Sequence, residues 1–135
     1  MIATVDTNVL VSGVFFGGTP GKVVNAAREG VFMLAVTPLL LSELRQVVSR
    51  AKFGLHPDAI ELLMADVEAY ATVVYPRKLH QVVASDSDDD AVVDCAVESG
   101  SLYIVSGDSH LTKTDTIAGI SVITPKSFVD LLKLE

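Results

Sequence analysis

The sequence is poor in cysteine, tryptophan and basic residues, and each shortage excludes something. It has one cysteine and no tryptophan, with 3 tyrosines and 5 phenylalanines. The lone Cys95 has no partner for an internal disulfide, so we expect a cytoplasmic protein. So few aromatic residues argue against base stacking as the main binding device.

Acidic residues outnumber basic ones by 17 to 10, which gives a formal net charge of −7. Such a balance normally argues against a nucleic-acid partner. The argument weakens when acids gather at one place, because a bound cation neutralises them there. The position of the acids therefore matters more than their number.

Long apolar runs are also absent. No run reaches the 18 or so residues that span a bilayer, and the N-terminus lacks the basic start of a signal peptide, so we expect no membrane association. Half of the 135 residues are hydrophobic, which suits one packed domain over residues 1–135.

Apolar runs and helical patterns alternate along the chain. Strands are expected at 2–6, 31–36, 72–76, 102–106 and 120–124, and helices at 20–30, 37–54, 56–70, 89–100 and 125–135. No element is predicted for residues 7–19. Because most of the strands are continuously apolar, they suit a parallel sheet that is covered on both faces. The prediction is an α/β protein, a three-layer α/β/α sandwich with a mostly parallel sheet of about five strands.

Acids follow the expected strands at their carboxyl ends, where open α/β sheets bind ligands. Asp6 closes the first strand, and Asp108 lies just past the strand 102–106. The run SDSDDD, residues 85–90, enters the helix that leads into that strand, and Glu43 lies early in another helix. Four acidic positions are therefore expected to converge on one edge of the sheet.

Helical periodicity indicates which acids point inward. Asp89 shares the apolar side of its helix with Val93 and Ala96, whereas Asp90 and Asp94 are expected nearer the solvent. Glu43 lies on the apolar stripe of the helix 37–54. A buried ionised carboxylate requires a partner.

Taken singly, each of these acids has an ordinary explanation as a helix cap, a turn residue or a member of an ion pair. Taken together, Asp6, Glu43, Asp89 and Asp108 would repel one another unless a cation lay among them. An all-oxygen site suits Mg²⁺ or Mn²⁺, which retain waters and bind phosphate oxygens. The pattern therefore favours a metal site that acts on a phosphate ester.

Four blocks carry a resemblance to a known family: TVDTNVLVSG (4–13), LLLSELRQVV (39–48), DSDDDAVVDCA (86–96) and IVSGDSHL (104–111). In this order they resemble the PIN-domain ribonucleases, and most closely the prokaryotic branch assigned to toxin–antitoxin systems. The resemblance extends from Met1 to the closing helix. It implies a parallel α/β/α fold and Mg²⁺- or Mn²⁺-dependent cleavage of single-stranded RNA.

The resemblance also implies roles for individual residues. Asp6, Glu43 and Asp108 match three metal-binding acids, and Asp89 is favoured as the fourth, with Asp90 as the alternative register and Asp94 as a further outer ligand. Asn8 and Ser106 match polar residues that orient the ligands. Where the commoner pattern has another acid after Asp108, this chain has Ser109 and His110.

The implied reaction is phosphodiester hydrolysis by a metal-activated water, which leaves a 5′-phosphate and a 3′-hydroxyl. It needs no side-chain nucleophile, and Cys95 is expected to be buried. Arg45, Arg50 and Lys52, all expected on the helix 37–54, are the best candidates for RNA binding. A small antitoxin protein is the expected partner, and the family's habit of dimerising suggests a homodimer.

Two other classes use acids in α/β folds. A Mg²⁺-dependent phosphatase of the haloacid-dehalogenase type needs an acid two residues after the strand-end aspartate, where Asn8 stands, and a phosphoryl-accepting receiver domain needs a lysine after the penultimate strand, where none occurs before Lys113. The third alternative is a non-catalytic PIN module, which the presence of every expected acid disfavours.

Overall fold

The computed structural model describes residues 1–77, 87–108, 112 and 116–133, and for residues 87–89 it describes the backbone alone. Within these residues six strands form one sheet in the order β3-β2-β1-β4-β6-β5. Their bounds are β1 (Ile2–Val5), β2 (Met33–Val36), β3 (Ala71–Val73), β4 (Tyr103–Val105), β5 (Thr116–Ile117) and β6 (Ile120–Ile123). Every neighbouring pair is parallel except β5 and β6. The sheet is therefore mostly parallel, as the sequence predicts.

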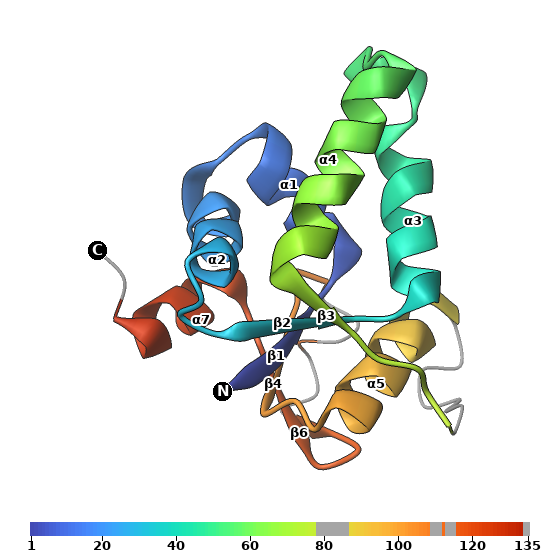
Figure 1. Cartoon of the computed structure of the whole chain (residues 1–135). Coiled ribbons are helices and arrows are strands. Elements are labelled where there is room, and N and C mark those ends of the chain that lie inside the picture. The colour runs from blue at the N-terminus through green and yellow to red at the C-terminus, as the bar shows by residue number, and fades with distance from the viewer. Residues whose placement is uncertain (78–86, 109–111, 113–115, 134–135) are drawn as a thin grey trace.

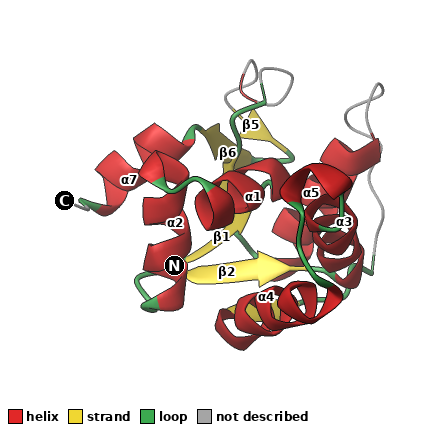
Figure 2. Ribbon diagram, turned by 90° about the horizontal axis from the view of Figure 1, so that it is seen from above, coloured by secondary structure: helices red, strands yellow, loops and turns green. Residues whose placement is uncertain are grey.

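Helices cover both faces of this sheet. They are α1 (Thr7–Phe15), α2 (Gly18–Arg28), α3 (Pro38–Val48), α4 (Pro57–Tyr70), α5 (Ser87–Ser99) and α7 (Pro125–Leu132), with a short 3₁₀ helix η1 (Ala51–Phe53). Figure 1 shows α1 to α4 above the sheet and α5 below it, and Figure 2 gives the view from above. This is the expected three-layer α/β/α arrangement. None of the described helices is long and apolar enough to cross a bilayer.

The alternation of side chains along the strands divides the buried residues between two cores. Ala3 and Val5 of β1 pack against helices α1 to α4 in the first core. The same core includes Val105 of β4 and Phe128 of α7. Ile104, one residue away from Val105, packs with α5 in the second core. Because successive residues of a strand point to opposite faces, β1 and β4 can be buried on both sides. This explains why their sequences are mostly apolar, with the buried Thr4 as the polar residue of β1.

Three elements differ from the sequence-based expectation. Residues 7–15 form helix α1, for which no element was expected, and the two-residue strand β5 is additional. The expected helix 37–54 is wrong after Val48, where α3 ends, because Arg50 has an extended backbone. At this break the Ser49 hydroxyl donates to the Arg45 carbonyl at 2.6 Å, which satisfies an acceptor in the last turn of the helix.

Helices α1 and α2 cross closely at Gly13. A Cβ atom at this position would lie 2.5 Å from Val24 Cγ2 and 2.6 Å from the Pro20 carbonyl oxygen. At Gly21, on the facing helix, the nearest atom to a new Cβ would be 3.6 Å away, which is ordinary contact. Only Gly13 is therefore required by the close approach of the two helices.

We expect Gly13→Ala to lower the free energy of unfolding by about 1–3 kcal/mol, because the backbone at Pro20 must move. Gly21→Ala should be neutral or stabilising by up to about 1 kcal/mol, because alanine favours the helix. Urea denaturation of both variants measures the difference. Equal stability of the two variants would contradict this account of the helix crossing.

Candidate functional site

The carboxyl ends of the parallel strands carry polar residues that start helices. Asp6 follows β1, Thr37 follows β2 and Thr124 follows β6, and each accepts a hydrogen bond from a backbone N–H of the helix that it caps. Ser106 and Asp108 follow β4, the neighbour of β1. The sheet thus gathers polar groups along one edge, where ligands bind in this class of fold.

The backbone N–H, the carbonyl and the carboxylate of Asp6 all form hydrogen bonds. Its backbone N–H donates to the Val105 carbonyl at 2.9 Å, and its own carbonyl accepts from Val9 at 3.0 Å and Leu10 at 3.2 Å. Its Oδ1 accepts from the Asn8 N–H at 3.4 Å, and the residue is 8% exposed. The strand and the helix together fix the direction of a nearly buried carboxylate.

Ser106 joins Asp6 to the loop that carries Asp108. Its hydroxyl donates to Asp6 Oδ2 at 2.9 Å and accepts from the Asp108 N–H at 3.0 Å, and the residue is 0% exposed. The Asp108 carbonyl accepts from the backbone N–H of Thr112 at 2.9 Å and from its hydroxyl at 3.0 Å. The structure therefore brings together Asp6, Ser106 and Asp108, all of which the sequence predicts as site residues.

Glu43 lies on helix α3 between the buried residues Leu40 and Leu44, and it is itself partly buried. Helix α3 packs against both α1 and α5. The expectation that Glu43 belongs to the inward-facing stripe is thus consistent with its burial.

Helix α5 places its acids differently from the expectation. Asp94 is 7% exposed, so the prediction that it faces solvent is wrong, whereas Val97 is 39% exposed. The reason is tertiary: α5 packs against β1, β2 and β4 and also against α3, so its middle is covered on two sides. Asp90 is partly buried. The side chains of Asp88 and Asp89, and residues Asp86, Ser109 and His110, lie outside what the structure describes.

The described side chains at this edge offer oxygen donors to a metal ion. The donors at the edge are carboxylate oxygens, which suit Mg²⁺ or Mn²⁺, and Ser106 orients one of them. Among the side chains that the structure describes, no three acids, histidines or cysteines are grouped closely enough to hold a metal. The set that includes Asp89 stays a prediction.

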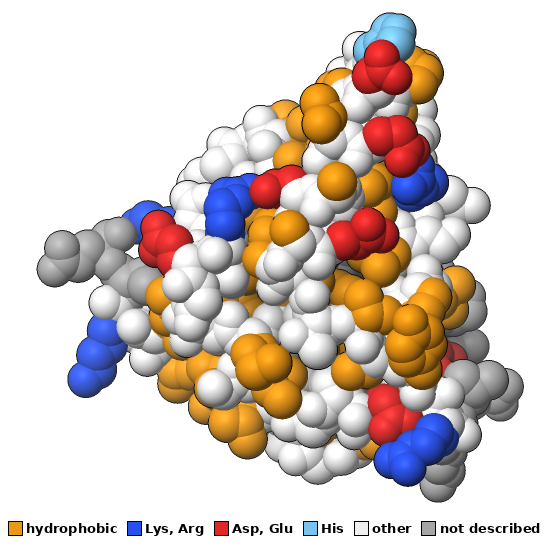
Figure 3. Space-filling view, in the orientation of Figure 1, with side chains coloured by type: hydrophobic (Ala, Val, Ile, Leu, Met, Phe, Trp, Pro, Cys, Tyr) orange, Lys and Arg blue, Asp and Glu red, His pale blue; other side chains and the backbone are white. Residues whose placement is uncertain are grey.

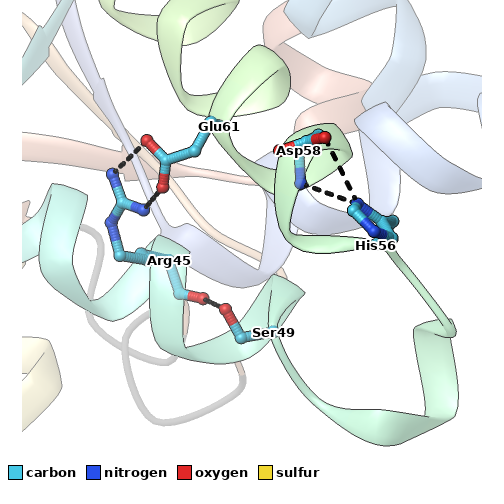
Figure 4. Close-up of polar contacts among 5 residues, drawn as sticks. All are labelled: Arg45, Ser49, His56, Asp58 and Glu61. Carbon is cyan, nitrogen blue, oxygen red and sulfur yellow. Dashed lines mark hydrogen bonds and ion pairs between the residues drawn. The ribbon is translucent and has the colours of Figure 1, made fainter.

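The basic candidates Arg45, Arg50 and Lys52 are not on one helix, contrary to expectation, because α3 ends before Arg50. Arg45 forms an exposed ion pair with Glu61 of α4, as Figure 4 shows. The hydrogen bond from Arg45 lowers the pKa of Glu61 and raises that of Arg45. Arg50 and Lys52 instead line a groove on the other side of α3, described next.

Two hollows meet at helix α1. The smaller one, of about 330 Å³, includes Asn8, Ser12, Gly107 and Asp108 in its lining. The larger one, of about 550 Å³, is called here the phenylalanine groove. Its lining includes Asn8, Ser12, Phe15, Phe16, Arg50 and Lys52. Asn8 and Ser12 line both hollows, so the groove begins next to Asp6.

The phenylalanine residues of this groove were not identified from the sequence. Their only signal there is the pair Phe15-Phe16 at the end of an apolar run, followed by Phe53 far along the chain. In the fold, the rings of Phe15 and Phe53 stack with centroids 4.4 Å apart and planes 9° apart.

Cys95 has no role as a nucleophile. It is 0% exposed, and burial raises the pKa of its thiol to about 11. The thiol is therefore enclosed, as expected from the sequence, and it is protonated at neutral pH.

Comparison with known proteins relates the whole chain to one fold. A chain in the crystal structure of VapBC2 from Rickettsia felis bound to a DNA fragment from their promoter aligns with a TM-score of 0.62 and 13% identity, covering 92% of this chain and 98% of that one. PAE2754 from Pyrobaculum aerophilum aligns with a TM-score of 0.62 and 20% identity, covering 99% and 90%. No curated protein matches the chain. The family model described as PIN domain matches residues 3–110, which include Asp6, Glu43, Asp89 and Asp108, and the chain therefore belongs to the PIN-domain family.

Proposed function

We propose that the protein is a metal-dependent endoribonuclease that cleaves single-stranded RNA. The observation that carries the proposal is the linkage of Asp6 and Asp108 through the buried hydroxyl of Ser106 at the carboxyl edge of the sheet. This edge is where α/β folds bind phosphate-bearing ligands, and the family match spans all four predicted acids. PIN domains are in general nucleases, which supports hydrolysis of a phosphodiester.

In this proposal Asp6, Glu43, Asp89 and Asp108 hold Mg²⁺ or Mn²⁺, with Asp90 as the alternative to Asp89 and Asp94 as an outer ligand. When bound, the cation supplies positive charge for the phosphate and lowers the pKa of a bound water. Ser106 and Asn8 keep the Asp6 carboxylate in one direction. Water attacks phosphorus, and the bond to the 3′ oxygen breaks, leaving a 5′-phosphate and a 3′-hydroxyl.

The biological setting belongs to the same proposal. The similarity of fold to a chain of VapBC2 supports a toxin of a toxin–antitoxin system, with a small antitoxin protein as partner. We further propose a cytoplasmic homodimer that acts on RNA through Arg50 and Lys52. The assignment of Arg45 to RNA binding remains a prediction, and it would compete with the ion pair to Glu61.

Replacing Asp6 tests the proposal directly. Asp6→Asn should reduce Mn²⁺-dependent cleavage of an unstructured RNA by about 100-fold or more, because a charged ligand of the cation is lost. Wild-type activity should vanish in EDTA and return with Mn²⁺. Asp130→Asn, which makes the same change at an exposed position of α7, should cleave normally. If nuclease-free wild-type protein leaves a panel of RNAs uncut with Mg²⁺ and Mn²⁺, the enzyme proposal fails and a non-catalytic module is favoured.

Replacing Ser106 tests how the site is oriented. Ser106→Ala should raise the Mn²⁺ concentration for half-maximal activity by about 10- to 100-fold, because it removes the donor to Asp6 Oδ2. Ser101→Ala is the matched control, since Ser101 is also a buried, hydrogen-bonded serine that flanks β4, but at its other end. Both variants should lose stability by about 1–3 kcal/mol. An equal Mn²⁺ requirement in the two variants would leave Ser106 with a structural role alone.

Substitutions in the acidic run test whether Asp89 or Asp90 is the fourth metal ligand. Asp89→Asn should reduce cleavage far more than Asp88→Asn, and it should raise or spare the melting temperature in EDTA because repulsion among the acids falls. Asp90→Asn measures the alternative register. Cleavage rates and thermal melts of the three variants decide the question, and equal losses for Asp88 and Asp89 would contradict the assignment.

A further inference from the structure

The phenylalanine groove has features that the proposed cleavage does not use. It starts at Asn8, whose N–H contacts Asp6, and follows α1 to Phe16, just past the last residue of that helix. A nine-residue helix is about 14 Å long. Stacked nucleotides advance about 3.4 Å each along one strand, so about four of them span this distance. The groove is therefore long enough for a short single strand that leads away from the acids.

The charge of the groove is opposite to that of the chain. Among the residues that the structure describes, Arg50 and Lys52 are the charged residues of its lining, and none of the lining residues is acidic. Lys52 Nζ lies 5.1 Å from the centroid of the Phe53 ring. In a protein with a formal net charge of −7, a groove whose described charges are both cationic complements a polyanion such as RNA, and its apolar residues, which include Val11, Val47 and Phe53, lie beside those charges.

One aromatic ring in the groove is presented to solvent. Phe16 is 76% exposed, although Phe15 beside it stacks on Phe53 and is partly buried. The ring centroids of Phe15 and Phe16 are 6.3 Å apart, so the exposed ring is supported by the stacked pair. An exposed ring in the same groove as two cations is the combination that binds single-stranded nucleic acid without sequence preference.

We propose that the phenylalanine groove is a binding subsite for the RNA strand on one side of the cleaved bond. A base within about four nucleotides of that bond stacks on Phe16, and the phosphates between them contact Arg50 and Lys52. This inference rests on the proposed function, because the groove matters to cleavage only if Asp6 belongs to the reacting site.

The absence of tryptophan permits a direct measurement. Phe16→Trp introduces the single indole of the chain, and titration with an unstructured eight-nucleotide RNA in EDTA should quench its fluorescence saturably. Tyr75→Trp is the control, since Tyr75 is also an exposed aromatic residue, 70% exposed, but lines a different hollow. Phe16→Ala should weaken binding of labelled RNA about ten-fold, whereas Phe16→Tyr should retain it.

The contacts to phosphates are tested separately, by the salt dependence of RNA affinity. Arg50→Ala and Lys52→Ala, each made in the Phe16→Trp protein, should each reduce the slope of log affinity against log salt by about 0.7. Lys22→Ala removes an exposed lysine from α2, outside both hollows, and should leave the slope unchanged.

Cleavage with Mn²⁺ is measured on the same preparations, so the two proposals can fail separately. Quenching without cleavage supports RNA binding by the groove and rejects the nuclease. Cleavage without quenching, or equal quenching at positions 16 and 75, overturns the subsite and leaves the groove to a protein partner.

Discussion

The hydrogen bond from Ser106 to Asp6 depends on the register of two parallel strands. Thr4 is opposite Ile104 and Val5 opposite Val105, so the next residues, Asp6 and Ser106, meet at the end of the ladder. A shift of one residue would turn every side chain of β4 to the other face of the sheet. The register is held because Val105 and Ile104 are buried in opposite cores. The apolar packing of the strands therefore determines which polar groups face each other at the edge.

The same packing explains how an acidic chain can present a cationic groove. Several acids form ion pairs with arginines: Asp66 with Arg28, Glu61 with Arg45 and Glu98 with Arg77. On the face in Figure 3, acidic and basic side chains are accordingly interspersed and form no field of one sign. Within the described part of the chain, Arg50 and Lys52 form no such ion pair, because α3 stops at Val48 and both residues line the groove beside α1. Net charge is thus a poor guide to the local potential.

The sequence predicts those features whose cause lies within a few neighbouring residues, and it misses those that depend on contacts between distant segments. Continuous apolar runs predict the parallel strands, and Thr37 followed by Pro38 predicts the start of α3, because these signals act within a few residues. Helix α1 is missed because its short apolar run VLV shows neither the alternation of a strand nor the periodicity of a helix. Its cap, Asp6, is also the residue that ends β1, so the sequence alone assigns it to the strand. The burial of Asp94 requires α3 to cover α5, which no pattern within residues 89–100 contains. At the site, Asp6, Ser106 and Asp108 follow from strand ends, but the groove needs Phe16 and Phe53 from distant segments.

The burial of α5 also sharpens the choice between positions 89 and 90. Position 89 precedes Val93 by four residues and Ala96 by seven, and both are 0% exposed. Position 90 precedes Asp94 by four residues and Val97 by seven. Asp94 is 7% exposed and Val97 is 39% exposed, so this side of the helix is buried at Asp94 and exposed at Val97. Since α5 begins at Ser87, positions 88 to 90 all lie in its first turn, where the helix dipole offsets part of their repulsion. The dipole acts on all three alike, so any selection between them must come from the faces that the helix buries, and Asp89 as the fourth ligand stays a prediction.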